Sequence, residues 1–236
     1  MNGGNKLYEI FALGDGALTI DWGNQMDEQI NREVTARAAQ FRQQPFPGFS
    51  ETVPAYSSLT VFFDPLFIRQ HISPGKTAME YVMERVQALL DLPVAVVQET
   101  GRLVRIPVCY DPSLAPELEW LAREKEISVE ELVILHTTPV YRVYMLGFLP
   151  GFAYMGEVDE RIRIPRKPQP QPTRAGSVGI AGKQTGIYPF ASPGGWTVIG
   201  NSPVQLFNKN RKEPTLIRAG DRVQFFAIDK YEFAHY

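Results

Sequence analysis

Hydrophobic residues in the first part of the chain switch between helical and strand-like spacing. Apolar side chains recur every three or four residues over 26–43 and over 76–90, which predicts two amphipathic helices. Runs rich in β-branched and aromatic residues predict strands at 7–12, 17–22 and 57–63. Two helices that bury one stripe each against a small sheet form an α+β sandwich. We therefore expect an α+β N-terminal domain over residues 1–95.

The second part of the chain has a different pattern. It opens with a predicted strand at 103–110, two short helices at 116–124 and 129–135, and a strand at 141–146. Ser128 and Glu131 have the spacing of a capping box for the second helix. Beyond this point helical periodicity ends, and Gly and Pro separate strand-like runs at 178–181, 196–199, 204–207, 215–217 and 222–228.

Many short strands with regular turns are typical of a β-barrel or a β-sandwich. We expect such a domain over residues 96–236. The boundary is placed within 91–101, because Leu92-Pro93 and Gly101 interrupt the apolar patterns on both sides.

Composition and charge exclude several classes of protein. The 236 residues carry a formal net charge of −2, so no basic surface for nucleic acid is expected. A single cysteine, Cys109, excludes an internal disulfide, and the three histidines lack metal-binding spacing, so no metal site is expected. The polar start of the chain shows no signal peptide, and no apolar run is long enough to span a bilayer. A cytoplasmic protein without membrane contact is the expectation.

Glycine and proline are concentrated in residues 147–207, which hold nearly half of those in the chain. They alternate with aromatic and β-branched residues, and the segment 184–208 carries no charge. Glycine allows close approach of the backbone to a ligand, and proline fixes the backbone. The pattern predicts a rigid, shaped surface, although tight barrel corners would explain part of it.

Two familiar catalytic motifs are absent from this segment. Gly182-Lys183 resembles the end of a phosphate-binding loop, but Ser177 and Gln184 stand where that loop requires Gly and Ser or Thr. Ser177 lies in a near match to a nucleophile elbow, but no helix follows it.

The remaining hypothesis is a cleft with one lysine and aromatic walls. Lys183 lies among glycines as a lone cation, and it is predicted to be catalytic together with Gln184 and Tyr188. Ser192 and Asn201 are candidates for hydrogen bonds to a small polar substrate, and His136 leads into the segment. The predicted walls are Phe148, Phe152, Tyr154 and Trp196. The candidates for binding a carboxylate or a phosphate are Arg163, Arg166 and Arg174.

Three stretches of this surface carry a family resemblance. They are Gly147-Phe148-x-Pro150-Gly151-Phe152-x-Tyr154-x-Gly156, the run from Gly176 to Pro189, and Ser192-Pro193-Gly194-Gly195-Trp196-x-x-Ile199-Gly200. The chain resembles the B-type subunit of bacterial ATP-dependent 5-oxoprolinase over nearly its whole length. The same family includes allophanate hydrolase subunit 1, carboxyltransferase subdomain C/D and the Kip-type inhibitors of sporulation histidine kinases.

The resemblance implies a cyclophilin-like β-barrel as the C-terminal domain, and two partners, the C-type and A-type subunits of 5-oxoprolinase. With ATP, the assembled enzyme would open 5-oxoproline to glutamate, and this chain alone would be inactive. Two alternatives from the same family stay open. One is a regulatory protein that binds a histidine kinase, and the other is the carboxyltransferase half-domain of a urea amidolyase or allophanate hydrolase-type enzyme.

Two positions depart from the family pattern. A second Pro-Arg is absent after Pro165-Arg166, unless Arg174 takes its place. Asn201-Ser202-Pro203 stands where the family commonly has Arg-Thr-Pro. These departures concern the substrate more than the fold.

Overall fold

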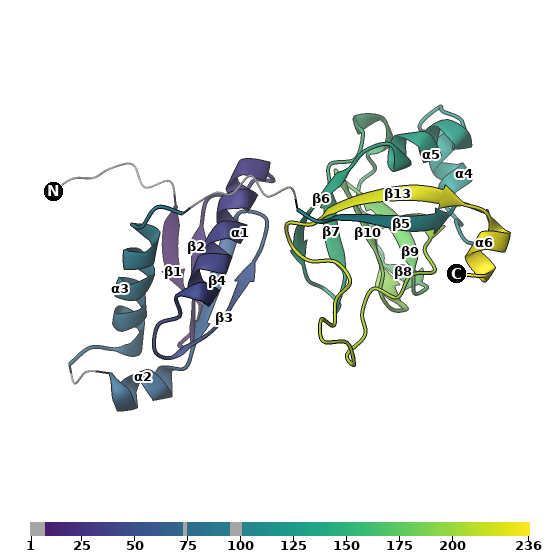
Figure 1. The fold of residues 1–236 in the computed structure, drawn as a ribbon. Helices are drawn as coiled ribbons and strands as arrows, with labels where there is room; N and C mark the ends of the chain where they lie inside the picture. Colours follow the sequence, from purple (N-terminus) through teal and green to yellow (C-terminus); the bar gives the residue numbers. More distant parts are fainter. Residues whose placement is uncertain (1–7, 73–74, 95–100) are drawn as a thin grey trace. The chain divides into compact units, whose positions relative to one another are not determined.

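The computed structural model describes residues 8–72, 75–94 and 101–236, which belong to two compact units (Figure 1). The first unit comprises Met1–Glu99 and the second comprises Thr100–Tyr236. The boundary segment predicted at 91–101 includes residues 95–100, which lie outside the described residues. Each unit has its own hydrophobic core.

The first unit is built on a four-stranded antiparallel sheet in the order β1-β2-β4-β3. Its elements are β1 (Glu9–Ala12), β2 (Ala17–Asp21), α1 (Glu28–Gln43), β3 (Phe49–Pro54), β4 (Ser58–Phe63), α2 (Pro65–His71) and α3 (Ala78–Leu90). In β4, buried and less buried residues alternate, so one face of the sheet is directed toward the core.

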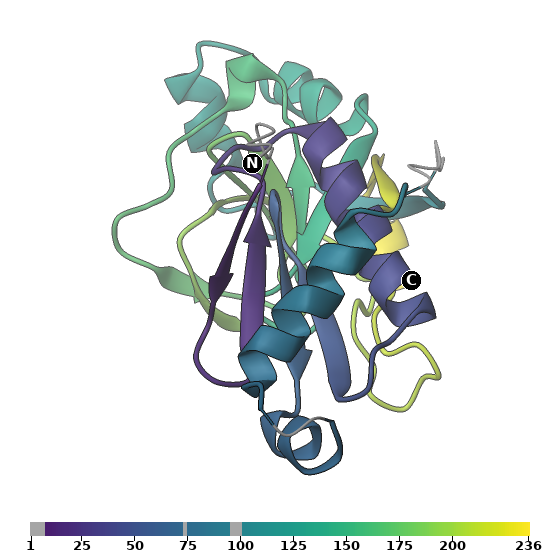
Figure 2. The same cartoon turned by 90° about the vertical axis from the view of Figure 1, so that its left-hand side faces the viewer.

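Helices α1 and α3 cover that face (Figure 2). Val34 and Phe41 of α1 and Val82 and Val86 of α3 are fully buried in a core shared with the sheet. The helix starts follow from local capping: Asp27 accepts from the N–H of Ile30 at the start of α1, and Thr77 and Glu80 form a complete capping box at α3.

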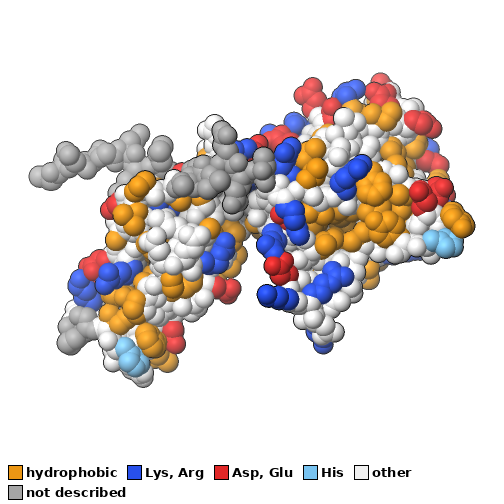
Figure 3. All heavy atoms as spheres, in the orientation of Figure 1, with side chains coloured by type: hydrophobic (Ala, Val, Ile, Leu, Met, Phe, Trp, Pro, Cys, Tyr) orange, Lys and Arg blue, Asp and Glu red, His pale blue; other side chains and the backbone are white. Residues whose placement is uncertain are grey.

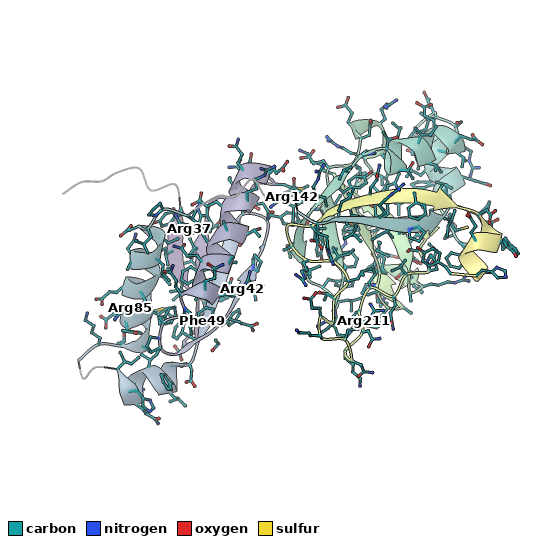
Figure 4. All side chains as sticks on the ribbon, viewed as in Figure 1. Arg37, Arg42, Phe49, Arg85, Arg142 and Arg211 are labelled. Carbon is teal, nitrogen blue, oxygen red and sulfur yellow. The ribbon has the colours of Figure 1, made fainter. Side chains whose placement is uncertain are left out.

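A buried arginine of α1, Arg37, connects this helix to the end of α3 (Arg37 is labelled in Figure 4). Arg37 of α1 is only 7 % exposed, and its guanidinium donates to the carbonyl oxygens of Leu89 and Leu92 at the end of α3. The Leu89 carbonyl lies in the last turn of α3, at the negative end of the helix dipole, so the cation is placed where it stabilises the helix.

The second unit is a closed seven-stranded barrel in the order β10-β7-β6-β13-β5-β12-β9, with β9 paired to β10. All neighbours are antiparallel except β13 and β5, which run parallel from Arg222↔Leu103 to Ile228↔Cys109. The strands are β5 (Leu103–Cys109), β6 (Tyr141–Leu146), β7 (Ala153–Gly156), β9 (Ser177–Ala181), β10 (Gln184–Ile187), β12 (Thr197–Asn201) and β13 (Arg222–Ile228). The prediction of an α+β unit followed by a β-barrel is confirmed.

Smaller elements surround the barrel. They are α4 (Leu118–Glu124), α5 (Val129–Thr137), the 3₁₀ turn η1 (Glu160–Ile162), α6 (Lys230–Ala234), and a separate two-stranded sheet of β8 (Gln171–Thr173) and β11 (Ser192–Gly194). Leu118, Leu121 and Leu132 from α4 and α5 are buried in the same core as the strands. On the face shown in Figure 3, hydrophobic side chains gather over β5 and β13, where Leu103 is 52 % exposed.

Several predicted elements differ from the structure. Residues 204–207 and 215–217 form no named strands and meet only in the bridge between Phe207 and Thr215. The Ser128 hydroxyl accepts from the N–H of Glu131, which is one half of the predicted capping box. Seven of the strands and helices in the structure were not predicted from the sequence: strand β3, helices α2 and α6, and the short strands β7, β8, β10 and β11.

Candidate functional site

A pocket of about 350 Å³ lies in the second unit, beside β7 and the hairpin formed by β9 and β10. This volume is at the lower end of the range for small-molecule sites, roughly 300–1,000 Å³. Its lining residues are Phe148, Phe152, Tyr154, Arg166, Ala181, Gly182, Gln184, Tyr188, Gly194, Gly195 and Trp196.

Phe152 is the centre of the aromatic wall. Its ring is 1 % exposed, and its centroid lies 4.8 Å from that of Tyr154, 5.2 Å from Tyr188 and 5.3 Å from Trp196. All three pairs are edge-to-face, the arrangement that aromatic quadrupoles favour. The wall is therefore a fixed cluster, and its members support each other's orientation.

Phe148 occupies a strained backbone position at the pocket. Its φ is +67°, in the left-handed region that side chains other than Gly rarely adopt, and its side chain is 58 % exposed. Its ring meets Phe152 edge-on at 5.6 Å. Because the ring is exposed, its burial does not compensate for the unfavourable backbone conformation of Phe148. Backbone strain of this kind is found at ligand sites.

Two glycines make room for the polar side chains of the pocket. A Cβ at Gly194 would lie 2.4 Å from the Tyr188 hydroxyl oxygen, and a Cβ at Gly195 would lie 2.7 Å from Nε of Arg166. A side chain at Gly194 would therefore displace the buried Tyr188 ring, and one at Gly195 would displace the Arg166 side chain. The Gly194-Gly195 pair thus allows the phenol and the guanidinium to lie directly against the backbone.

The two tyrosine hydroxyls keep their protons at neutral pH. Burial raises the pKa of Tyr154 and of Tyr188 above the usual value, and the nearby Arg166 cation opposes part of each increase. The backbone N–H of Trp196 also donates to the Tyr188 oxygen and lowers its pKa, by less than burial raises it. Both phenols can therefore donate hydrogen bonds to a ligand.

Arg166 is the one charged residue among those that line the pocket. Its side chain is exposed, and within the described part of the chain no carboxylate forms an ion pair with it. Neighbouring cations are paired: Lys167 lies 2.9 Å from Glu117, and Lys183 lies 3.6 Å from Glu157. The pocket therefore contains a positive charge that is available to an anion.

Seven of the thirteen residues predicted from the sequence line this pocket: Phe148, Phe152, Tyr154, Arg166, Gln184, Tyr188 and Trp196. They come from β7, β10 and the loops around them. The structure therefore brings together the predicted walls, one of the predicted arginines and two of the predicted polar groups.

The environment of Lys183 differs from the prediction. Lys183 lies on the turn between β9 and β10, next to the lining residues Gly182 and Gln184, but it does not itself line the pocket. Its side chain is 55 % exposed and forms an ion pair with Glu157. The expectation of a lone cation is wrong, because the pairing of β7 with β10 brings the Glu157 carboxylate next to the lysine.

His136 lies inside the barrel core rather than in the pocket. It is fully buried, its Nδ1 lies 2.7 Å from the Tyr110 hydroxyl, and its Nε2 lies 2.9 Å from Oγ1 of Thr185. The Thr185 hydroxyl donates to the carbonyl of Gly179, so it accepts from Nε2–H, and Nδ1 then accepts from the Tyr110 hydroxyl. Burial lowers the pKa of His136 to about 3. A neutral, fully hydrogen-bonded histidine here is a structural residue, which corrects its assignment to the substrate.

The four other predicted residues also lie outside the lining. Arg163 pairs with Glu157 at 2.9 Å, and Arg174 is exposed beyond the pocket. The Asn201 amide donates to the carbonyl of Ala175 and supports a turn. Ser192 lies in β11, where its carbonyl accepts from Thr173.

Gly194 and Gly195 were not predicted as parts of the pocket. Two adjacent glycines before a tryptophan were the available signal, since they indicate close approach of other groups to the backbone. Across the described residues there is no cluster of three or more side chains that could hold a metal ion, and no helix there is long and apolar enough to cross a membrane.

Comparisons with known proteins relate this chain to a family. The family model for the carboxyltransferase domain, subdomain C and D, matches residues 8–217. The B-type subunit of 5-oxoprolinase from Bacillus subtilis (strain 168) is 45 % identical over 231 residues, which cover 97 % of this chain and 96 % of that protein. Its counterpart in Haemophilus influenzae is 38 % identical over 218 residues, with 92 % and 96 % covered.

A solved structure agrees with this relationship. The crystal structure of TTHA0988 superimposes with a TM-score of 0.76 at 37 % identity, over 90 % of this chain. The chain spans about 40 % of the length of that protein. The matched regions thus cover most of both units, in relatives of similar length and within a longer chain. The chain belongs to the family of B-type 5-oxoprolinase subunits, which carries the carboxyltransferase subdomains C and D.

Proposed function

We propose that this chain is the B-type subunit of a 5-oxoprolinase and opens 5-oxoproline to glutamate together with the A-type and C-type partner subunits. The observation that carries the proposal is the 45 % identity to a protein of that name over nearly the full length of both chains. The pocket adds a chemical argument, because a flat, polar ring suits an aromatic wall with a few hydrogen-bonding groups.

Ring opening requires water to add to the lactam carbonyl carbon and the C–N bond to break, with the nitrogen taking up a proton. A lactam is a poor electrophile, so we propose that ATP drives the step. The lactam oxygen would take the γ-phosphoryl group and ADP would leave. Water would then add to the activated carbon, and the C–N bond would break with proton uptake by nitrogen to give an acyl phosphate. A second water would hydrolyse this acyl phosphate to glutamate and phosphate. We assign ATP to the assembled enzyme, because Gly182-Lys183 lacks the pattern of a phosphate-binding loop.

Residues of this chain would stabilise the charge that develops on the lactam oxygen. Tyr188 and Gln184 line the pocket and carry hydrogen-bond donors. Lys183 is flanked by lining residues, and its exposed ion pair with Glu157 is worth no more than about 1 kcal/mol. The ammonium group can therefore leave Glu157 for a ligand oxygen, and we propose Lys183 as the catalytic cation.

A chain that works with partner subunits needs surface for contact. The hydrophobic side chains over β5 and β13 provide exposed apolar surface on the barrel (Figure 3). Contiguous surface of this type commonly takes part in contacts between proteins.

Reconstitution tests the proposal. The purified chain is mixed with the A-type and C-type subunits from the same source, and glutamate release from 5-oxoproline is measured with and without ATP. We expect release only when all three subunits and ATP are present. Omitting this chain is the matched control. Equal turnover by this chain alone, or no turnover by the complete mixture, would contradict the proposal.

A further inference from the structure

We infer that Arg166 makes the pocket a binding site for a small monocarboxylate attached to a neutral, flat ring. This inference deepens the proposed function, on which the identification of the ligand as 5-oxoproline rests. The site itself is argued below from the chemistry of the pocket.

The charge of the pocket limits the ligand to a monoanion. Arg166 supplies the single full charge in the lining, and no ion pair in the described structure neutralises it. One guanidinium matches one carboxylate through two parallel N–H···O bonds. A single guanidinium does not match the several negative charges of a nucleoside triphosphate, which proteins usually bind with several cations and backbone N–H groups.

The backbone that carries Arg166 is held in place. The N–H of Lys167 donates to the carbonyl of Gly195 at 2.7 Å, and the Lys167 ammonium pairs with Glu117 at 2.9 Å. Glu117 in turn accepts from the N–H of Val198 at 2.7 Å. These bonds attach the arginine segment to the strand region behind the pocket. A ligand therefore meets a guanidinium on a preorganised backbone, which lowers the entropic cost of binding.

The rest of the lining is neutral and suits the remainder of such a ligand. Tyr154 and Tyr188 have a raised pKa and remain protonated, so they donate to a carbonyl or carboxylate oxygen without adding charge. Phe148 and Trp196 offer apolar ring faces for the flat part of the ligand. A lactam ring with one carboxylate has this combination of groups.

Binding to the isolated full chain tests the inference. Isothermal titration calorimetry is carried out with 5-oxoproline and with 2-pyrrolidinone, which is the same lactam ring without the carboxylate. We expect 5-oxoproline to bind about 10- to 100-fold more tightly, in line with the usual strength of a hydrogen-bonded charge pair. The comparison of these two ligands needs no variant, so it remains decisive if a variant fails to fold.

Arg166→Met should remove the preference, so that both ligands bind the variant equally weakly. Arg174→Met is the matched control, because that arginine is also exposed on the barrel but does not line the pocket, and it should bind as the unmodified chain does. Equal affinity of the unmodified chain for both ligands, or an unchanged preference in Arg166→Met, would overturn the inference.

The assembled enzyme separates this inference from the proposed function. Arg166→Met should raise the KM for 5-oxoproline about 10-fold or more while leaving the KM for ATP unchanged. If the substituted enzyme is active and its KM for 5-oxoproline is unchanged, the inferred carboxylate site is refuted and the proposed function stands. If the chain binds 5-oxoproline through Arg166 but the complete mixture shows no turnover, the proposed function is refuted and the inferred site stands.

Discussion

Mild acid should destabilise the barrel through the buried His136. Its imidazole is fully buried between Tyr110 and Thr185 and stacks on Phe225 at 4.6 Å, and burial lowers its pKa from 6.5 to about 3. In the unfolded chain the same ring takes up a proton below about pH 6.5. Between these two pKa values the unfolded state binds one more proton than the folded state, so stability falls as the pH falls.

The size of the effect follows from the separation of the two pKa values. Each pH unit below 6.5 lowers the free energy of unfolding by about 1.4 kcal/mol, until the folded-state pKa of about 3 is reached. The free energy of unfolding at pH 5.0 is therefore about 2 kcal/mol lower than at pH 7.5. This is a large fraction of the 5–15 kcal/mol that is usual for the free energy of unfolding of a protein. Carboxyls with a lowered pKa, such as those of Asp111 and Asp159, contribute mainly below this range.

Urea unfolding followed by tryptophan fluorescence at pH 7.5, 6.0 and 5.0 measures the loss. His136→Gln is the matched variant, because its amide can donate to Thr185 and accept from Tyr110 but cannot take up a proton in this range. The variant should be less stable at pH 7.5 and show a much smaller change with pH. The first unit is identical in both proteins, so the difference between them reports on the barrel. A loss below about 0.5 kcal/mol in the unmodified chain, or the same pH dependence in both proteins, would refute the reasoning.

Three further predictions concern the pocket and the two units. Gly194→Ala should destabilise the chain by about 1–3 kcal/mol in urea unfolding, because the new Cβ would lie 2.4 Å from the Tyr188 hydroxyl oxygen. Gly147→Ala should be nearly neutral, because its Cβ would meet the flexible end of Met145 at 3.2 Å and Tyr154 at an ordinary contact distance of 3.9 Å. Equal stability of these two variants would contradict the packing argument. Lys183→Met should leave the melting temperature and 5-oxoproline binding unchanged while lowering turnover of the assembled enzyme about 100-fold, and normal turnover would remove Lys183 from the catalytic site. Limited proteolysis should cut first within 91–101 and release two stable fragments; cleavage elsewhere, with this segment intact, would contradict separable domains.

Elements with strong local patterns could be predicted from the sequence. The strand over Arg222–Ile228 was predicted with the bounds that the structure has, because β-branched and aromatic residues fill it and turn residues precede it. Helix α2 was missed although Asp64-Pro65 is a recognisable helix start, in which the Asp64 carboxylate accepts from the N–H of Leu66 and of Phe67. Strands β8 and β11 have three residues each, with a proline in each, so their pairing depends on tertiary structure rather than on local preference.

The composition of the pocket was predictable, but its electrostatics were not. The aromatic residues of 147–207 indicated an apolar wall, and five of them line the pocket. The pairing of Lys183 with Glu157 depends on the register between β10 and β7, in which Gln184 lies opposite Gly156. The burial of His136 depends on contacts with Tyr110, Thr185 and Phe225, which lie far from it in sequence. Spacing along a chain cannot supply such long-range contacts.

The parallel pairing of β13 with β5 has a consequence for synthesis of the protein on the ribosome. The first strand of the barrel needs the last one as its neighbour, so the barrel cannot close until residues 222–228 have left the exit tunnel. The described strands and helices of the first unit lie within residues 9–90, so we expect this unit to fold while the rest is still being made. During that interval β5 has an unpaired edge, at which a nascent chain is open to aggregation or to capture by a chaperone.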